Sequence, residues 1–280
     1  MPDSAHRHFS IPPLFAPETG TTIIEPAGNE SGFWAGACNV LYDDETGKFY
    51  LYYRVRKPHP IRGGQCTIAE SDDGVSFRTI WEATREEFDS PSIEKSSILK
   101  TAEGNWRLYI SYVDSSDNRW RVDVMSADRP DAFDPATRKK VLAADDIAAE
   151  GVKDPYAFVI GGRTYLLLSY APKPAAPSDD EKGKMHATAD IYNTGITKSS
   201  SGLASSSDGE NFVWHGDIFV PRQEGWDCYA SRLGSFLYLP PAFVGFYDGS
   251  ADVSENYEER TGIAISFDLR KWERVTESGP

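Results

Sequence analysis

The sequence has few of the features that mark disulfide-stabilised, nucleic-acid-binding or membrane proteins. Its three cysteines, Cys38, Cys66 and Cys228, are odd in number and widely spaced, which indicates neither a disulfide framework nor a zinc motif. Basic residues are outnumbered by acidic ones, and the formal net charge of −14 argues against nucleic acid and anionic membranes as partners. No run of about 18 apolar residues occurs, so no membrane-spanning segment is expected.

The composition instead indicates a globular protein. Hydrophobic residues make up 40% and aromatic residues 12% of the 280 residues, and many of them favour strands. The first residues, MPDSAHRHFSIPP, lack the apolar core of a signal peptide, and we therefore expect a cytoplasmic location. No feature marks a second domain, so we expect one domain over residues 1–280.

Two short patterns alternate along the chain. The first joins an apolar strand, a serine, a turn and an aromatic strand, and it covers residues 67–80, 122–135, 201–216 and 261–275. The second reads as strand, turn and strand, and it covers residues 40–56, 98–114, 157–172 and 235–249. Asp-Gly pairs such as Asp73-Gly74 are strong hairpin signals. Together the patterns predict four-stranded antiparallel meanders repeated in series, which favours a β-propeller over a β-sandwich.

Four such units are visible in the sequence. A fifth would have to use residues 9–33 or lie between 172 and 226. We treat residues 1–33 as an N-terminal segment and the proline-rich, charged stretch 172–190 as a loop or lid insertion. Residues 143–151 have the composition of one short helix.

Acidic residues lie where three of the four units begin. In a propeller the first strand of each blade is nearest the axis, so the residues that lead into these strands converge on one mouth of the central channel. Here those residues include Glu94, Asp154 and Asp227. Buried carboxylates are costly unless they are paired or functional, and a set of them in one cleft is what glycoside hydrolysis requires.

At this point the sequence resembles the superfamily of five-bladed propeller glycoside hydrolases. The segment FYLYYRVR followed by IAESDDGVSF is similar to the first blade of family 130, and VKDPY resembles the Asp-Pro motifs of these families. SIEKSSIL is similar to a motif of one family 43 branch, and family 32 is a more distant likeness. The resemblance implies an all-β, five-bladed propeller of four-stranded antiparallel blades with an acidic site in its central funnel.

The resemblance also implies catalytic roles for particular residues. Asp154 matches the aspartate of the Asp-Pro motif, and Glu94 matches the glutamate of the family 43 motif. Asp227, Glu258 and Glu259 are the candidates for the proton donor. Two departures stand out: Cys38 or Asn39 occupies the place of the usual first-blade aspartate, and Tyr156 replaces the arginine that follows the family 130 motif.

Structural explanations compete with these roles. Asp154 is also suited to cap a turn before Pro155, Glu94 to pair with Lys95, Asp227 to pair with Arg232, and Glu258 to lie in a solvated loop. Aromatic rings stack on sugars but equally pack blades together. With these alternatives open, we expect a substrate-binding set of Trp34, Asn39, Lys95, Lys153, Tyr156, Trp226, Tyr229 and Arg232.

The combined hypothesis is a glycosidase acting on a carbohydrate or glycoside. Glu94 or Asp154 would be the base or nucleophile, and Asp227 or Glu258 the acid. No metal site is predicted, although the resemblance to family 43 allows a structural Ca²⁺ in the channel. The alternatives are a phosphorylase or transferase, an inactive sugar-binding propeller, and a protein-binding scaffold. The sequence specifies neither the sugar nor the oligomeric state.

Overall fold

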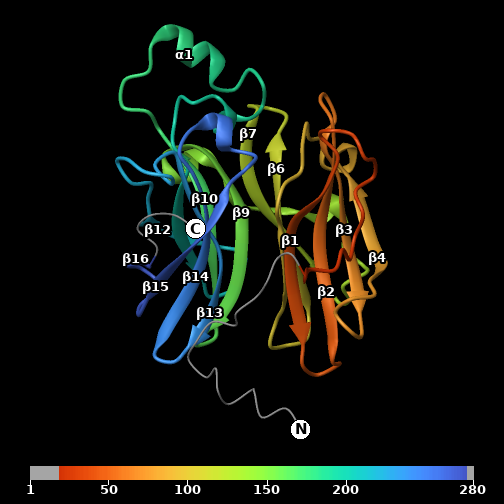
Figure 1. Ribbon diagram of the computed structural model, residues 1–280. Coiled ribbons are helices and arrows are strands. Elements are labelled where there is room, and N and C mark those ends of the chain that lie inside the picture. Colours follow the sequence, from red (N-terminus) through yellow and green to blue (C-terminus); the bar gives the residue numbers. More distant parts are fainter. Residues whose placement is uncertain (1–18, 276–280) are drawn as a thin grey trace.

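The computed structural model describes residues 19–275 and shows an all-β propeller of four four-stranded antiparallel sheets (Figure 1). In each sheet, or blade, strands adjacent in sequence are neighbours. Blade I comprises β1 (Trp34–Asp43), β2 (Lys48–Lys57), β3 (Arg62–Ser71) and β4 (Arg78–Thr84). Blade II comprises β5 (Ser97–Lys100), β6 (Trp106–Asp114), β7 (Arg119–Ala127) and β8 (Lys139–Leu142). Blade III comprises β9 (Ala149–Ile160), β10 (Arg163–Pro172), β11 (Ser200–Ser206) and β12 (Val213–Phe219). Blade IV comprises β13 (Ala230–Leu239), β14 (Ala242–Ser250), β15 (Arg260–Ser266) and β16 (Glu273–Arg274).

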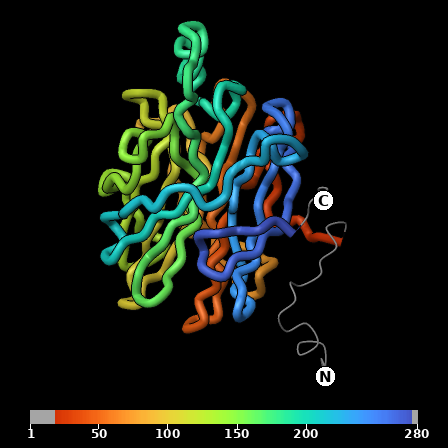
Figure 2. The backbone as a smooth tube through the Cα atoms, turned by 90° about the vertical axis from the view of Figure 1, so that its left-hand side faces the viewer, coloured from red at the N-terminus to blue at the C-terminus, as the bar shows by residue number. Residues whose placement is uncertain are grey.

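Helical structure is confined to the connections. The α-helix α1 (Asp179–Lys184) lies in the long connection between β10 and β11, and Figure 2 shows this connection projecting from one end of the molecule. Short 3₁₀ segments occupy Arg85–Phe88, Pro135–Thr137, Ala144–Ile147, Ile191–Asn193 and Val253–Glu255. None of the helices within residues 19–275 has the length and apolar character needed to cross a membrane.

A Ser-x-Asp sequence shapes the outer hairpin in three of the four blades. In blade I, the Ser71 hydroxyl accepts the Gly74 N–H at 2.9 Å, while the Asp73 carboxylate accepts the N–H groups of Val75 and Ser76. The same bonds recur around Ser206 and Asp208 in blade III and around Ser266 and Asp268 in blade IV. These side chains satisfy the turn's backbone donors locally, which explains the repeat seen in the sequence.

The predicted repeats are therefore confirmed as blades, but a fifth four-stranded sheet is absent from residues 19–275. Residues 19–33 contain turns and bends, with Ile24 packed against the outer face of blade I. The other stretch considered for a fifth blade, 172–226, supplies the α1 connection and the last two strands of blade III. Residues 9–18 lie outside the described part of the chain. Blades IV and I face each other across a groove of about 650 Å³ lined by β1, β13 and β14.

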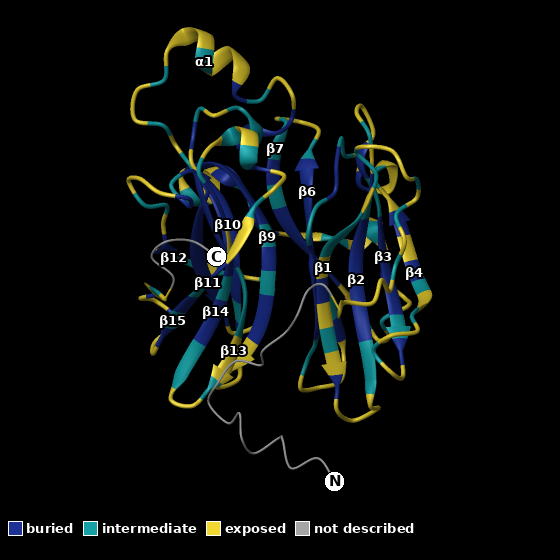
Figure 3. Cartoon of the chain, viewed as in Figure 1, coloured by how far each residue is buried: buried dark blue, intermediate teal, exposed yellow. Residues whose placement is uncertain are grey.

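The apolar core lies between consecutive blades. Tyr52 and Ile68 of blade I share one buried cluster with Leu108 of blade II, and two further clusters join blades II and III and blades III and IV. Figure 3 shows buried residues along the central strands and exposed ones at the turns and on α1. Packing of sheet faces in series orients the first strands β1, β5, β9 and β13 toward one another.

Hydrogen bonds between blades fix the positions of these first strands. At each of the three junctions, a side-chain oxygen of one blade accepts a backbone N–H from the first strand of the next. The three pairs are Asn39 Oδ1 with Ile98 N (3.0 Å), Ser97 Oγ with Ala157 N (2.9 Å) and Ser201 Oγ with Leu233 N (2.7 Å). All of these residues are buried or nearly so. Each bond therefore gives a partner to a backbone N–H that would otherwise be buried without a hydrogen bond.

We predict that Gly63→Ala destabilises the fold. Gly63 accepts the Ile93 N–H at 2.9 Å, and an added Cβ would overlap the Ile93 carbonyl oxygen. Overpacking of this kind costs about 1–3 kcal/mol, measurable as a shift in the denaturation midpoint. Gly183→Ala in α1 is the control, because no atom lies near its added Cβ and alanine favours helix. Equal stability of the two variants would contradict the close approach of blades I and II.

Candidate active site

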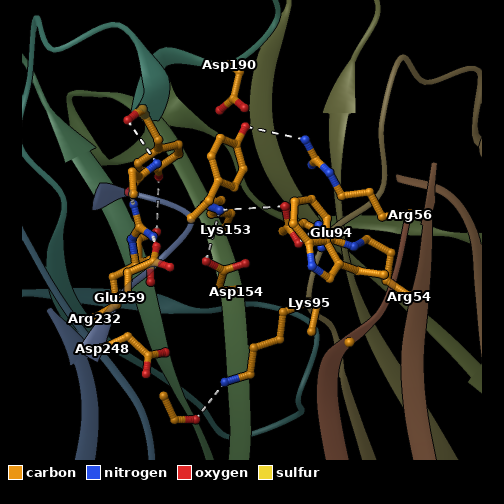
Figure 4. Close-up of a pocket in the computed structure, with 18 of the residues that line it drawn as sticks. Arg54, Arg56, Glu94, Lys95, Lys153, Asp154, Asp190, Arg232, Asp248 and Glu259 are labelled. Carbon is orange, nitrogen blue, oxygen red and sulfur yellow. Dashed lines mark hydrogen bonds and ion pairs between the residues drawn. The ribbon is translucent and has the colours of Figure 1, made fainter. Parts of the chain in front are cut away.

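A pocket of about 330 Å³ opens where the first strands converge (Figure 4). This volume is sufficient for a small-molecule ligand. Although the protein is strongly acidic, the ionisable side chains around this pocket are balanced between the two signs. The five basic residues are Arg54, Arg56, Lys95, Lys153 and Arg232, and the five acidic residues are Glu94, Asp154, Asp190, Asp248 and Glu259.

Backbone hydrogen bonds hold Glu94 in position at the start of blade II. The Glu94 N–H donates to the Ser111 carbonyl at 2.9 Å, and the Glu94 carbonyl accepts a hydrogen bond from the Tyr52 hydroxyl at 2.8 Å. The Glu94 side chain contacts the Arg54 guanidinium, and its second oxygen lies 3.8 Å from the Lys153 ammonium. Only 13% of the side chain is exposed.

The charge around Glu94 keeps its carboxyl group ionised. Burial by itself raises the pKa of Glu94, but the positive charges of Arg54, Lys153 and Arg56 outweigh burial and lower that pKa to about 2. Glu94 is therefore a carboxylate at any physiological pH. An ionised, fixed carboxylate is suited to act as a base or a nucleophile.

Asp154 lies inside β9 at a break in the regular strand. Its φ of 55° is left-handed, and the pairing of β9 with β10 shifts register between Leu167 and Ser169. Adjacent residues of a regular strand point to opposite faces, but at this bulge both Lys153 and Asp154 line the pocket. This arrangement explains why Asp and Pro occur within a sequence that is otherwise typical of a buried strand.

The Asp154 carboxylate is only partly satisfied. One oxygen lies 3.2 Å from the Lys153 ammonium, whereas the other is buried and has no hydrogen-bond partner within residues 19–275. A left-handed backbone conformation at a non-glycine residue and a buried oxygen without a hydrogen bond each raise the free energy of the folded state. Features of this kind cluster at functional sites. Lys153 connects it to Glu94, as Figure 4 shows.

Glu259 supplies a carboxyl group from blade IV. Its oxygen accepts a hydrogen bond from Arg232 at 2.7 Å. Burial raises the pKa of Glu259 above its ordinary value of 4.5, although Arg232 acts in the opposite direction. The pKa values of Glu259 and Glu94 are thus displaced in opposite directions, which is the pattern of an acid and a base sharing one site.

The connection that carries α1 forms part of the pocket wall. Asp190 and Asn193, from the end of this connection, line the pocket, and Arg62 of blade I donates to the Asp190 carboxylate at 2.8 Å. Tyr192 is buried, with its ring centroid 4.9 Å from the Lys153 ammonium. The last residue of the predicted lid 172–190 and residues just after it therefore line the site.

Six of the residues predicted from sequence line this pocket, together with one of the proton-donor candidates. Glu94, Asp154, Lys95, Lys153 and Arg232 meet there with Trp34 at its rim. Glu259 joins them, whereas its neighbour Glu258 is exposed and lies outside the pocket. Of these two neighbouring candidates, the structure places Glu259 in the pocket and Glu258 outside it, a difference that sequence spacing does not reveal because it does not fix the direction of a loop side chain.

Asp227 is not part of the pocket. It is fully buried in blade IV, where Arg222 and Arg274 each donate to it at 2.6 Å and the Tyr247 hydroxyl donates at 3.2 Å. Arg274 belongs to the short last strand β16, so Asp227 fastens the end of the blade. Its predicted role as a catalytic acid is replaced by this structural one.

Four predicted substrate contacts do not line this pocket and instead serve the fold. Asn39 accepts the Ile98 N–H described above, and Tyr156 packs edge-on against Phe236. Trp226 is buried against Tyr247 with ring centroids 5.4 Å apart, and the Tyr229 hydroxyl donates to the Tyr192 carbonyl at 2.6 Å. Aromatic residues near the axis thus pack blades together, which was the competing explanation.

Sequence reasoning missed Arg54, Arg56, Asp190 and Asp248. Arg54 and Arg56 lie two residues apart on β2 and so face the same side of the strand. Two arginines on one face of an otherwise apolar, buried strand are a detectable signal. Asp190 and Asp248 carry no comparable signal, because their neighbours in sequence do not distinguish them from other turn and strand-end acids.

No group of three or more His, Cys, Asp or Glu side chains within residues 19–275 is placed to hold a metal ion. Glu94, Asp154 and Glu259 are instead paired with basic side chains. The Ca²⁺ allowed by the sequence resemblance would therefore have no such cluster of side chains among these residues.

No protein-family model and no curated protein matches this sequence. Solved structures do share its fold. An α-L-arabinofuranosidase from Lactobacillus brevis is 16% identical with a TM-score of 0.60, covering 88% of this chain and 73% of its own. A β-1,2-mannobiose phosphorylase from Listeria innocua is 14% identical with a TM-score of 0.58, covering 91% and 79% respectively. Zg3597, a family 117 glycoside hydrolase from Zobellia galactanivorans, is 16% identical with a TM-score of 0.59, covering 88% and 70%. The chain therefore has the propeller fold of glycoside hydrolases and phosphorylases.

We predict that Asp227→Ala lowers the free energy of unfolding by up to about 3–5 kcal/mol, because it leaves two partly buried arginines without their shared carboxylate. Urea denaturation measures this loss. Asp72→Ala is the matched control, since the Asp72 side chain is 87% exposed and pairs loosely with Lys48. An Asp227→Ala variant as stable as the control would contradict the structural role.

Proposed function

We propose that this protein is an enzyme that hydrolyses a glycosidic bond in a carbohydrate or glycoside. The observation that carries the proposal is the opposite displacement of two pKa values in one pocket, with Glu94 ionised and Glu259 displaced toward the protonated form. Glycoside hydrolysis uses one carboxylate and one carboxylic acid. The fold shared with glycosidases and phosphorylases supports the same chemistry.

In this mechanism Glu259 donates a proton to the departing glycosidic oxygen. Glu94 acts as the base that activates water, or as the nucleophile that attacks the anomeric carbon. The positive charge that develops on the sugar ring is stabilised by the nearby carboxylates, and Asp154 is suited to this because one of its oxygens is unpaired. Lys153 lies between the two acids, 3.8 Å from Glu94 and 3.2 Å from Asp154, and its positive charge favours the ionised form of Glu94.

The pocket also has surfaces for a sugar ring. Trp34 at the rim is 42% exposed, and Tyr257 is 49% exposed. Their rings are nearly parallel with centroids 6.1 Å apart. Exposed aromatic faces beside a polar pocket favour carbohydrate, because the C–H groups of a sugar pack on such faces while its hydroxyls bind charged side chains.

The test is hydrolysis of a panel of nitrophenyl and methyl glycosides by the wild type and three variants. Glu94→Gln and Glu259→Gln should each lower kcat by about 10²–10⁴-fold. The loss in Glu259→Gln should be smaller for nitrophenyl than for methyl glycosides, because a good leaving group needs no proton. Glu258→Gln is the control and should retain activity, since Glu258 is exposed outside the pocket.

Turnover should be the same with and without inorganic phosphate, since hydrolysis uses water. Release of sugar 1-phosphate only when phosphate is present would replace hydrolysis by phosphorolysis. Full activity in both Glu94→Gln and Glu259→Gln would contradict the proposed site itself.

A further inference from the structure

One basic group of the pocket differs from the others. Arg56 on β2 is only 6% exposed and lines the pocket, yet it forms no ion pair within residues 19–275. Its one hydrogen bond to a residue in this range is a long one, 3.4 Å, to the Tyr257 hydroxyl. The Arg56 Nε is buried and has no partner among the described residues.

The other four basic groups of the pocket have partners within residues 19–275: three pair with acidic side chains, and Lys95 binds a backbone carbonyl. Arg54 contacts Glu94, Lys153 lies between Glu94 and Asp154, and Arg232 pairs with Glu259. Lys95 donates to the Gly234 carbonyl at 2.8 Å, and Figure 4 shows its ammonium pointing away from Arg56. Acidic residues outnumber basic ones in this chain, whose net charge is −14. The absence of an ion-pair partner for Arg56 within residues 19–275 therefore reflects the arrangement of this pocket and not a shortage of acids.

Two aromatic rings partly stabilise the Arg56 charge but leave its hydrogen-bonding capacity unused. The guanidinium carbon lies 5.3 Å from the Trp34 ring centroid and 5.1 Å from that of Tyr257. Cation–π contacts at these distances are favourable, but aromatic carbons accept no conventional hydrogen bonds. A buried guanidinium with free N–H groups is costly unless a ligand supplies the acceptor oxygens.

We propose, on the basis of the function proposed above, that the substrate is an acidic saccharide whose carboxylate binds Arg56. The guanidinium fork matches the two oxygens of a carboxylate, and the single negative charge of that group would balance the charge of Arg56. A phosphate dianion would require more unpaired positive charge than this end of the pocket offers. The sugar ring would then lie against the exposed aromatic pair beside Arg56.

The experiment compares matched acidic and neutral sugars by calorimetric titration. The probes are glucuronate with glucose, galacturonate with galactose and mannuronate with mannose, and inorganic phosphate is a separate arm at equal ionic strength. For at least one pair, the wild type should bind the acid at least about tenfold more tightly than the neutral sugar. Arg56→Gln should remove this preference, and Arg56→Lys should retain part of it because the charge remains without the fork.

Arg78→Gln is the matched control, because Arg78 is a largely exposed arginine of blade I that pairs with Glu70 away from the pocket. It should keep the wild-type preference, and thermal unfolding verifies that each variant is folded. Equal affinity for all acidic and neutral partners, or a preference that survives in Arg56→Gln, would overturn the inference. Binding of phosphate but of no acidic sugar would also overturn it and assign Arg56 to phosphate.

These outcomes are independent of turnover. Hydrolysis of neutral glycosides without any preference for acids would refute the inference and leave the proposed function intact. Acid-selective binding by a protein that cleaves no glycoside would refute the proposed function and leave the carboxylate site in place.

Discussion

The structure depends on a hydrogen bond that recurs at each blade junction. A side-chain oxygen of one blade accepts a backbone N–H from the first strand of the next, through Asn39, Ser97 and Ser201. These bonds allow two polar strand edges to meet in the interior, because they replace the hydrogen bonds to water that the edges lose. Because the first strands are held in this way, the residues beside them face one channel. Glu94 and Asp154, sixty residues apart in the chain, are thereby connected through a single lysine.

The pocket concentrates positive charge inside an acidic protein. Arg54, Lys153 and Arg56 surround Glu94 and make its ionised form favourable despite burial, whereas Glu259 has Arg232 as its only ion-pair partner within residues 19–275. The same set of residues thus displaces the pKa values of two carboxyl groups in opposite directions. The proposed glycosidase reaction would require such a difference between its acid and its base. The distortion of β9 at Asp154 belongs to the same arrangement, since it turns two consecutive side chains into the pocket.

The blade repeats could be predicted from sequence because their signals are local. Ser71, Asp73 and their counterparts bind the turn backbone within three residues, so the sequence pattern alone specifies the turn. Glu94 and Asp154 could be predicted because they lead into or lie on buried strands. Glu259 and Glu258 could not be distinguished, since a loop's direction depends on contacts with residues far away. Asp227 was assigned to the site for the same reason: its partner Arg274 is 47 residues distant, and sequence alone does not reveal it.

The most direct test of this account is the titration of individual glutamate carboxyl groups by ¹³C NMR, with Glu94→Gln and Glu259→Gln used to assign the two signals. The account predicts that the Glu94 signal titrates near pH 2 and that the Glu259 signal titrates above 4.5. Two signals that both titrate near 4.5, or the reverse order, would contradict the claim that the pocket holds one carboxyl group ionised and displaces the other toward its protonated form.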